Sequence, residues 1–518
     1  MRLRLFAFLL LLLATPATAE WHEAQSEHFV IYADDRAEDV KAFAEMLESY
    51  HAALELITGR KVDNVSPSSR LTIYAVGSAR QMQKLTGGDK FVAGFYIPGA
   101  GFSRAFVEDI RIDRTNLHFS MQILLHEYAH HFLMSQSRFA MPRWMNEGAA
   151  EFFASAQFPR SGNVSIGRPN NNRAYELAFA TEVSIRELLD YELYAGKKRR
   201  TYDTFYGRSW LLYHYLVFND ARKGQLTAYA RNVMNGMDSL EAAKAAFGDF
   251  DVLEKELDKY ARARRMTTFN LTPDKLPPMS PVTVRRVSAG HAAVLPLVIR
   301  SQRGVTEEEA ARIVAEARAV AARFPDDAWV HAGLAEAEFD AGDDARAIAA
   351  ADRAIALNPK LVNAYVQKGY ALFRRAGEAA DQAAAFKAAM APWTQLNKLE
   401  NDHPLPLLYY YRSYAERGEE PPEHARHALE RAAQLAPFDH GLWFETAMMQ
   451  ADEGKLPLAI SSLSPLAANP HGGDMAKRAA ALVEAMKAAP QDRPFDPAPV
   501  LTTVMKEEAG SGSGGGGD

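Results

Sequence analysis

The chain has 518 residues, of which 48% are hydrophobic and 24% charged, so it can form two or three globular domains and is too apolar to be disordered throughout. Its formal net charge is −6 and its pI is about 6.2, which gives no electrostatic reason to expect a nucleic acid as a partner. There is no cysteine, which excludes disulfides, thiolate metal ligands and lipidation at cysteine.

Residues 1–19 have the pattern of a secretory signal peptide. Two arginines precede an unbroken apolar run over 5–14, and Ala17-Thr18-Ala19 forms a small-x-small cleavage site before Glu20. The apolar run is well short of the ~20 residues that span a bilayer. No later segment has the length and apolarity of a transmembrane helix. We therefore expect a secreted protein without an integral membrane segment after cleavage, and the lack of cysteines favours the bacterial periplasm.

Residues 20–268 are expected to form one domain of the α+β class. Short β-like runs are predicted at 29–32, 71–76, 94–97 and 105–107, and a helix is predicted over 37–58. A second helix is expected over 116–135, and further helices over 209–218 and 239–246. The domain therefore begins with a small sheet and continues as mostly helical structure.

A cluster of prolines between 273 and 281 interrupts the helical pattern, and we place a linker at 269–305. From 306 to 490 the chain is alanine-rich and predicts an all-α domain of tetratricopeptide-like repeats. One unit carries Gly342, Ala347, Ala351, Ala354 and Pro359 at the expected places. A non-repetitive helical bundle is the alternative. Stacked repeats leave a groove that commonly holds a peptide or protein partner. Residues 491–518 are predicted to be a flexible tail.

The motif that bears most on function is His126-Glu127-Tyr128-Ala129-His130. On a helix the two histidines lie one turn apart on the same face, where both can bind one Zn²⁺. Glu127 lies beside them and can act as general base toward a metal-bound water. The alternative is a pair of satisfied core histidines, but burying them with a glutamate is costly unless a metal compensates. His131 faces about 100° away from His130 and is expected to be structural.

A catalytic zinc usually has a third protein ligand, and the segment from Pro142 to Phe153 can supply it. Glu147 and Glu151 lie one helical turn apart there. One carboxylate can bind the metal, and the other can accept the N–H of a liganding histidine. The residue spacing alone does not decide which glutamate has which role.

These two motifs together resemble the gluzincin branch of zinc metallopeptidases, the thermolysin-like group. The wider segment, roughly 21–266, resembles exported bacterial proteins of the peptidase-MA-like type. The resemblance implies a zincin-like fold, with His126, His130 and Glu147 as zinc ligands and Glu151 as support for a histidine. The family usually adds a tyrosine or histidine that polarises the scissile carbonyl. Tyr206 and His214 are the candidates for that role.

We therefore expect an exported zinc metallopeptidase that hydrolyses a peptide or protein substrate, with Glu127 as general base and Zn²⁺ as cofactor. The helical repeats would recruit the substrate or a protein partner. The alternative is a catalytically inactive peptidase-like scaffold or binding protein that acts through its repeats. A fully occupied fourth coordination position at the zinc would favour this alternative.

Overall fold

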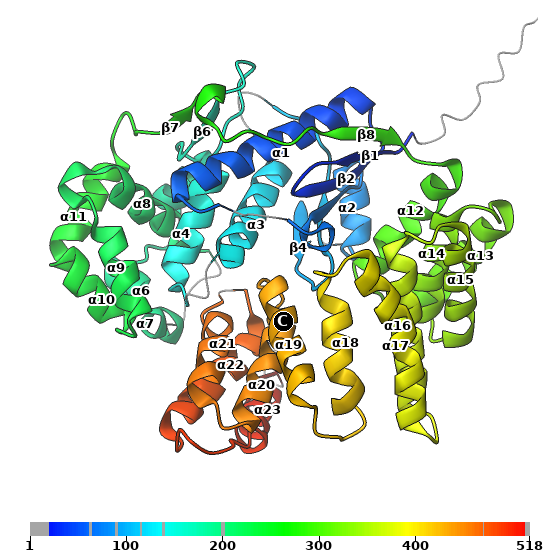
Figure 1. The fold of residues 1–518 in the computed structure, drawn as a ribbon. Helices are drawn as coiled ribbons and strands as arrows, with labels where there is room; N and C mark the ends of the chain where they lie inside the picture. The colour runs from blue at the N-terminus through cyan, green and yellow to red at the C-terminus, as the bar shows by residue number, and fades with distance from the viewer. Residues whose placement is uncertain are drawn as a thin grey trace, which may run out of the picture.

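The protein is described as a computed structural model over residues 20–61, 65–88, 92–113, 117–136, 140–197, 202–469 and 471–512. The predicted signal peptide at 1–19 and the last residues, 513–518, lie outside the described residues. The described chain is mostly helical. A sheet-containing N-terminal part is followed by a helical array that curves below it (Figure 1).

The N-terminal part contains a six-stranded sheet in the order β4-β5-β3-β2-β1-β8. Strands β2, β3 and β5 are parallel, and β1, β4 and β8 are antiparallel to their neighbours. The strands are β1 His22–Gln25, β2 Phe29–Ala33, β3 Leu71–Ala75, β4 Gly94–Ile97, β5 Ser103–Val107 and β8 Thr283–Arg286. The four predicted β-like runs are thus β2 to β5.

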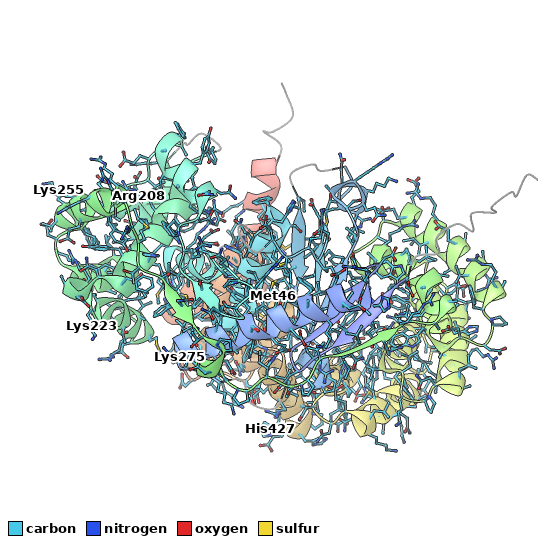
Figure 2. The ribbon with its side chains drawn as sticks, turned by 90° about the horizontal axis from the view of Figure 1, so that it is seen from above. Met46, Arg208, Lys223, Lys255, Lys275 and His427 are labelled. Atoms are coloured by element: carbon cyan, nitrogen blue, oxygen red, sulfur yellow. The ribbon has the colours of Figure 1, made fainter. Side chains whose placement is uncertain are left out.

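Alternating side chains give the sheet two buried faces. In β2, Phe29 and Ile31 point to one face, where they pack with α1 (Ala37–Thr58) and α3 (Phe119–Gln136). Tyr32 points to the other face and packs with α2 (Ala79–Leu85) and α12 (Ala289–Gln302). Seen from above, α1, which carries Met46, crosses the middle of the molecule (Figure 2). The sheet and α1 together form a rigid base for α3.

The rest of the N-terminal part is helical, as predicted. Helices α4 and α8 pack closely, and a two-stranded sheet of β6 and β7 lies beside them. The elements are α4 Arg143–Ala154, β6 Val164–Ile166, α5 Asn171–Phe179, α6 Ile185–Leu189, α7 Tyr191–Gly196, α8 Phe205–Phe218, α9 Gln225–Met234, α10 Ser239–Phe247, α11 Phe250–Ala261 and β7 Phe269–Leu271. The predicted helices over 209–218 and 239–246 correspond to α8 and α10.

The segment 269–305 is not the linker that its prolines suggested. Residues Thr283–Arg286 form β8, which pairs with β1 and extends the main sheet. Residues 289–302 form α12, which packs on α13 and α14. Val294 and Leu295 of α12 are buried against the array and the sheet, and this tertiary packing favours a helix despite Pro296 within it. The segment joins the two parts into one folded unit.

The helical array runs from α13 to α22, and each helix packs against the next. Its tight contacts use small residues, and Ala347, Ala351 and Ala354 are fully buried. The helices are α13 Glu307–Arg323, α14 Ala328–Asp340, α15 Asp344–Leu357, α16 Val362–Gly377, α17 Gln382–Leu399, α18 Pro404–Ala415, α19 Glu423–Leu435, α20 His440–Asp452, α21 Leu456–Ala467 and α22 Gly473–Ala488. No helix among the described residues is both long and apolar enough to cross a membrane.

The predicted flexible tail at 491–518 is helical over much of its length. Helix α23 covers Ala498–Gly512 and packs against α22. Phe495, Val500 and Leu501 pack on the apolar cluster formed by α20 to α22, and their burial offsets the loss of chain entropy. The prediction of a flexible tail beginning at residue 491 is therefore wrong for the residues that form α23.

The array also contacts the N-terminal part directly. The Ala100 N–H donates to Asp439 Oδ2 at 2.7 Å, and the Ser68 N–H donates to Glu400 Oε1 at 2.9 Å. The His131 ring lies against Phe438, with centroids 4.5 Å apart. Along these contacts, the side of the array that faces the sheet is covered by this same chain.

Glu336 in α14 is a buried carboxyl in the array, near Gln302 and Asn363. Burial and the charge of Asp340 raise its pKa from 4.5 to about 7. The unfolded chain therefore releases this proton at lower pH than the folded protein does. This group makes the folded state lose stability as the pH rises from about 4.5 to 7, by on the order of 3 kcal/mol.

We expect Glu336→Gln to remove this loss and to make the protein more stable than wild type at pH 8. At pH 4 the carboxyl is mostly protonated in both states, so the difference between variant and wild type should be small there. Urea unfolding at both pH values measures the effect, with Glu316→Gln on the exposed surface of the array as the matched control. Equal pH dependence in wild type and Glu336→Gln would contradict the assignment.

Candidate metal centre

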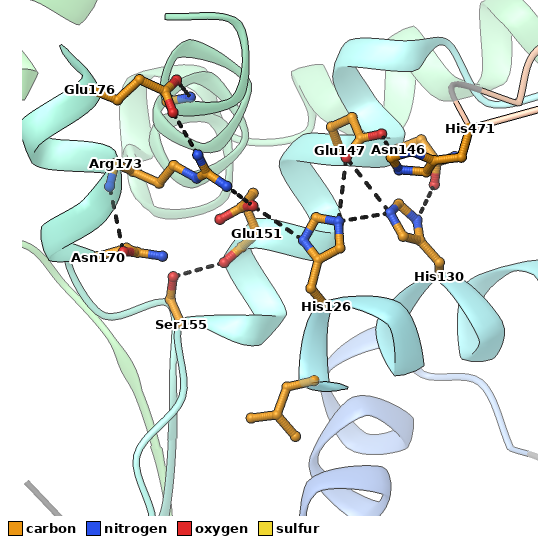
Figure 3. Close-up of polar contacts among 12 residues, drawn as sticks. His126, His130, Asn146, Glu147, Glu151, Ser155, Asn170, Arg173, Glu176 and His471 are labelled. Carbon is orange, nitrogen blue, oxygen red and sulfur yellow. Dashed lines mark hydrogen bonds and ion pairs between the residues drawn. The ribbon is translucent and has the colours of Figure 1, made fainter. Parts of the chain in front are cut away.

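Helix α3 presents His126 and His130 on one face while its other face packs into the core. Leu124, Leu125 and Phe132 are buried against the sheet and α1, which fixes the rotation of the helix. The two imidazoles therefore point toward α4 (Figure 3). Their Nε2 atoms are 3.0 Å apart. Two ligand atoms of one tetrahedral zinc, each ~2.1 Å from the metal, are separated by roughly 3.3 Å.

Glu147 in α4 is fully buried between these histidines. Its Oε2 atom lies 3.4 Å from His126 Nε2 and 3.7 Å from His130 Nε2. Neither carboxylate oxygen accepts a hydrogen bond of normal geometry. A buried ionised carboxylate needs positive charge beside it, which protonated imidazoles or a metal ion can supply, and three donor atoms at these separations fit a divalent metal such as zinc.

The glycine after Glu147 allows α4 to approach α8 closely. A Cβ atom on Gly148 would lie 2.5 Å from the carbonyl oxygen of Ser209, so no larger residue fits without separating the helices. This close contact fixes the position of α4 on α8. It gives a packing reason for the glycine that follows Glu147.

The second nitrogen of each histidine is held by an oxygen atom. His130 Nδ1 lies 3.0 Å from Asn146 Oδ1, and His126 Nδ1 lies 3.2 Å from Glu151 Oε1. Arg173 in turn donates to Glu151 at 2.6 Å. In a neutral imidazole, an oxygen at Nδ1 favours the tautomer with its proton there, which leaves the Nε2 lone pair free for a metal. Glu151 therefore lies where a supporting carboxylate is expected.

Electrostatics couple these groups strongly. In the metal-free protein, burial lowers the pKa of His126, but Glu147 and Glu151 outweigh it and raise that pKa to about 10. Burial raises the pKa of Glu151, but His126 and Arg173 outweigh it and lower that pKa to about 2. The pKa of Glu147 is likewise held well below its usual range by the imidazoles around it, against the effect of burial. Both carboxylates are therefore ionised and attract a cation.

Glu127 follows His126 on α3 and takes no part in the contacts among His126, His130 and Glu147, the three residues that we call the cluster. It is half-buried, and it has no hydrogen bond or ion pair to another described residue. Its charge acts on Tyr96 and on His471. Glu127 is therefore available to a molecule that enters the site. Its neighbour His131 is structural, with Nδ1 2.7 Å from the Tyr96 hydroxyl.

The two candidates for carbonyl polarisation lie in different surroundings. His214 is buried in α8, with Nε2 2.8 Å from Gly167 O and Nδ1 2.8 Å from Tyr260 Oη, and its contacts do not include the cluster. Tyr206, two turns earlier, lies under the Arg173 guanidinium at 5.0 Å. Burial and the charge of Glu147 raise the pKa of Tyr206. Of the two, only Tyr206 lies close enough to feel the charge of Glu147.

His471 is a site residue that the sequence did not reveal. It lies in the loop between α21 and α22, and its Nε2 atom is 2.9 Å from Glu147 Oε1. Its ring centroid is 5.5 Å from that of His130. Each of His126, His130, Glu147 and His471 offers one ligand atom, and these four atoms all lie within 4.8 Å of one another. The sequence offered no signal for this residue, because it is far from the motif along the chain.

Residues 120–234 match a family described as a protein of unknown function (DUF1570). The matched stretch includes the whole cluster on α3 and α4, and the description names no activity. No curated protein matches the sequence. Among solved structures, the crystal structure of a thermophilic TPR protein from Thermus thermophilus is similar at 16% identity. The match covers 38% of this chain and 100% of the Thermus thermophilus chain, with a TM-score of 0.32.

Proposed function

We propose that this chain is an exported zinc-dependent peptidase of the gluzincin, thermolysin-like kind, with a zincin-like domain joined to tetratricopeptide-like repeats. The observation that carries the proposal is the convergence of His126 Nε2, His130 Nε2 and Glu147 Oε2 at 3.0 to 3.7 Å. These separations suit three ligands of one zinc ion. The signal-peptide pattern of residues 1–19 supports export to the periplasm.

In this proposal different residues bind the metal, transfer the proton and donate a hydrogen bond to the substrate. His126, His130 and Glu147 hold the zinc, which when bound supplies positive charge that activates a water and polarises a carbonyl. Glu127 accepts the proton of the attacking water and returns it to the leaving amine. The raised pKa of Tyr206 keeps its phenol protonated, so it can donate a hydrogen bond to the carbonyl oxygen.

A second function is favoured by His471. Its imidazole offers a fourth ligand atom within 4.8 Å of the other three, and a catalytic zinc usually keeps its fourth position for water or substrate. This arrangement suits a catalytically inactive scaffold or binding protein that acts through its helical repeats. A protein partner bound by the array is compatible with either function.

Hydrolysis of a mixture of fluorogenic peptides tests the proposal, with wild type and His471→Ala assayed in parallel. For a zinc peptidase we expect hydrolysis to be lost after chelation and restored by Zn²⁺. Hydrolysis that persists after complete removal of metal would contradict it. No hydrolysis by zinc-loaded His471→Ala would favour the scaffold.

A further inference from the structure

We infer that His471 is a fourth protein ligand of the metal, supplied by the helical array, and that this end of the array closes the site. The inference rests on the proposed zinc site. With His471 included, the cluster has three imidazoles and one carboxylate, enough for a four-coordinate zinc made entirely of protein atoms. Such a site has no position left for a substrate carbonyl or a water.

The imidazole of His471 is directed into the cluster. Its Nε2 atom is 2.9 Å from Glu147 Oε1. The two α3 histidines lie near the other carboxylate oxygen, Oε2. Figure 3 shows His471 reaching the cluster from the C-terminal ribbon, opposite the α3 backbone. His471 therefore offers a fourth ligand atom within 4.8 Å of those of His126, His130 and Glu147.

The four ligands differ in how firmly they are held. The side chains of Glu147 and His130 are 0% and 5% exposed, whereas that of His471 is 46% exposed. His126 and His130 each have an oxygen at Nδ1. His471 Nδ1 makes no such contact with another described residue. Because it is the most exposed of the four and lacks this support, His471 is the ligand that can leave at the lowest cost.

The loop that carries His471 is attached to the interface between the two parts. The His471 N–H donates to Asn469 Oδ1 at 3.0 Å, and Asn469 Nδ2 lies 3.1 Å from His440 Nδ1 on α20. A cavity of about 60 Å³ adjoins this loop. It is lined by Leu133, Met134 and Met141 from the N-terminal part and by Trp443, Pro465 and Leu466 from the array.

Movement of this end of the array would therefore withdraw His471 and open the fourth position. Asp439, which begins α20, holds the array here through its contact with the Ala100 N–H. With His471 bound to the metal the protein is latent, because a peptide must displace His471 before its carbonyl can reach the metal. If only a fraction of molecules is open, the apparent affinity for a fourth ligand is the intrinsic affinity multiplied by that fraction.

Cobalt-substituted protein tests the inference, since the visible absorption of Co²⁺ reports its coordination. Acetohydroxamate, a small metal-binding ligand, is the probe. We expect wild type and His471→Ala each to bind one Co²⁺ at saturation. We expect His471→Ala to bind acetohydroxamate at least ten-fold more tightly than wild type and to have a different metal spectrum before the probe is added. His427→Ala, on the outer rim of the array (Figure 2), is the matched control and should behave as wild type.

Asp439→Asn is a second variant that leaves all four ligands in place. Its Oδ1 atom still caps α20 by accepting from the Leu442 N–H, but it loses the oxygen that faces Ala100. We expect its acetohydroxamate affinity to lie between those of wild type and His471→Ala. Equal spectra and equal affinities in wild type and His471→Ala would overturn the inference while leaving the zinc site intact. Absence of bound metal in every variant would overturn the zinc site as well.

Discussion

Replacing Glu147 with alanine is expected to lower the zinc affinity by at least 100-fold while the fold is retained. Glu147 is fully buried, and its Oε2 atom lies near both α3 histidines. Residues that only support a ligand typically contribute 10- to 100-fold to metal affinity, so loss of a direct ligand should exceed that range. Competition with a chromophoric zinc chelator measures the affinity. In wild type, added zinc should also raise the unfolding temperature, because it binds the folded state.

Two further variants make this result specific. Glu48→Ala removes another buried carboxylate that pairs with a histidine, His28, away from the cluster, and should leave zinc affinity unchanged. Glu151→Gln should weaken binding by 10- to 100-fold, because it loses the carboxylate charge that supports His126. An unchanged zinc affinity in Glu147→Ala would remove Glu147 from the ligand set.

Glu127→Gln is expected to keep the zinc and to abolish most of the hydrolysis. The amide has the shape of the carboxylate but accepts no proton at neutral pH, and general-base catalysis contributes about 10²- to 10⁴-fold. Because His471 closes the site in our account, the comparison is made between His471→Ala and His471→Ala/Glu127→Gln. Zinc content and peptide hydrolysis are measured on the same preparations.

A loss of hydrolysis without a loss of zinc would separate the role of a general base from that of a metal ligand. Glu127 makes no ion pair or hydrogen bond to another described residue, so its replacement should change neither the unfolding temperature nor the metal content. A double variant that hydrolyses peptides as fast as His471→Ala would contradict the assignment of Glu127 as the base. The proton acceptor would then have to be another group.

The sequence predicted the part of the site that is local along the chain. His126 and His130 lie one turn apart, and Glu147 and Glu151 lie one turn apart on the next helix, so helical periodicity alone places each pair on a common face. The structure brings the two pairs together through the packing of α3 on α4. Their metal-binding roles remain predictions until a metal is measured.

The features that the sequence did not predict depend on long-range packing. His471 enters the cluster only because the array curves back to the N-terminal part (Figure 1). Tyr206 and His214 share α8, and only their surroundings distinguish a residue beside the cluster from a buried one. The segment 269–305 contains enough prolines to suggest a linker, yet β8 pairs with β1 across the sheet edge. No local pattern encodes such contacts.

The most direct test of the account is the zinc content of the wild-type protein, measured by elemental analysis after dialysis against metal-free buffer. We predict one zinc per chain, bound with a dissociation constant below the micromolar range. Protein that contains no zinc, and that takes up neither Zn²⁺ nor Co²⁺ when either is supplied, would contradict the central claim that His126, His130 and Glu147 form a metal centre.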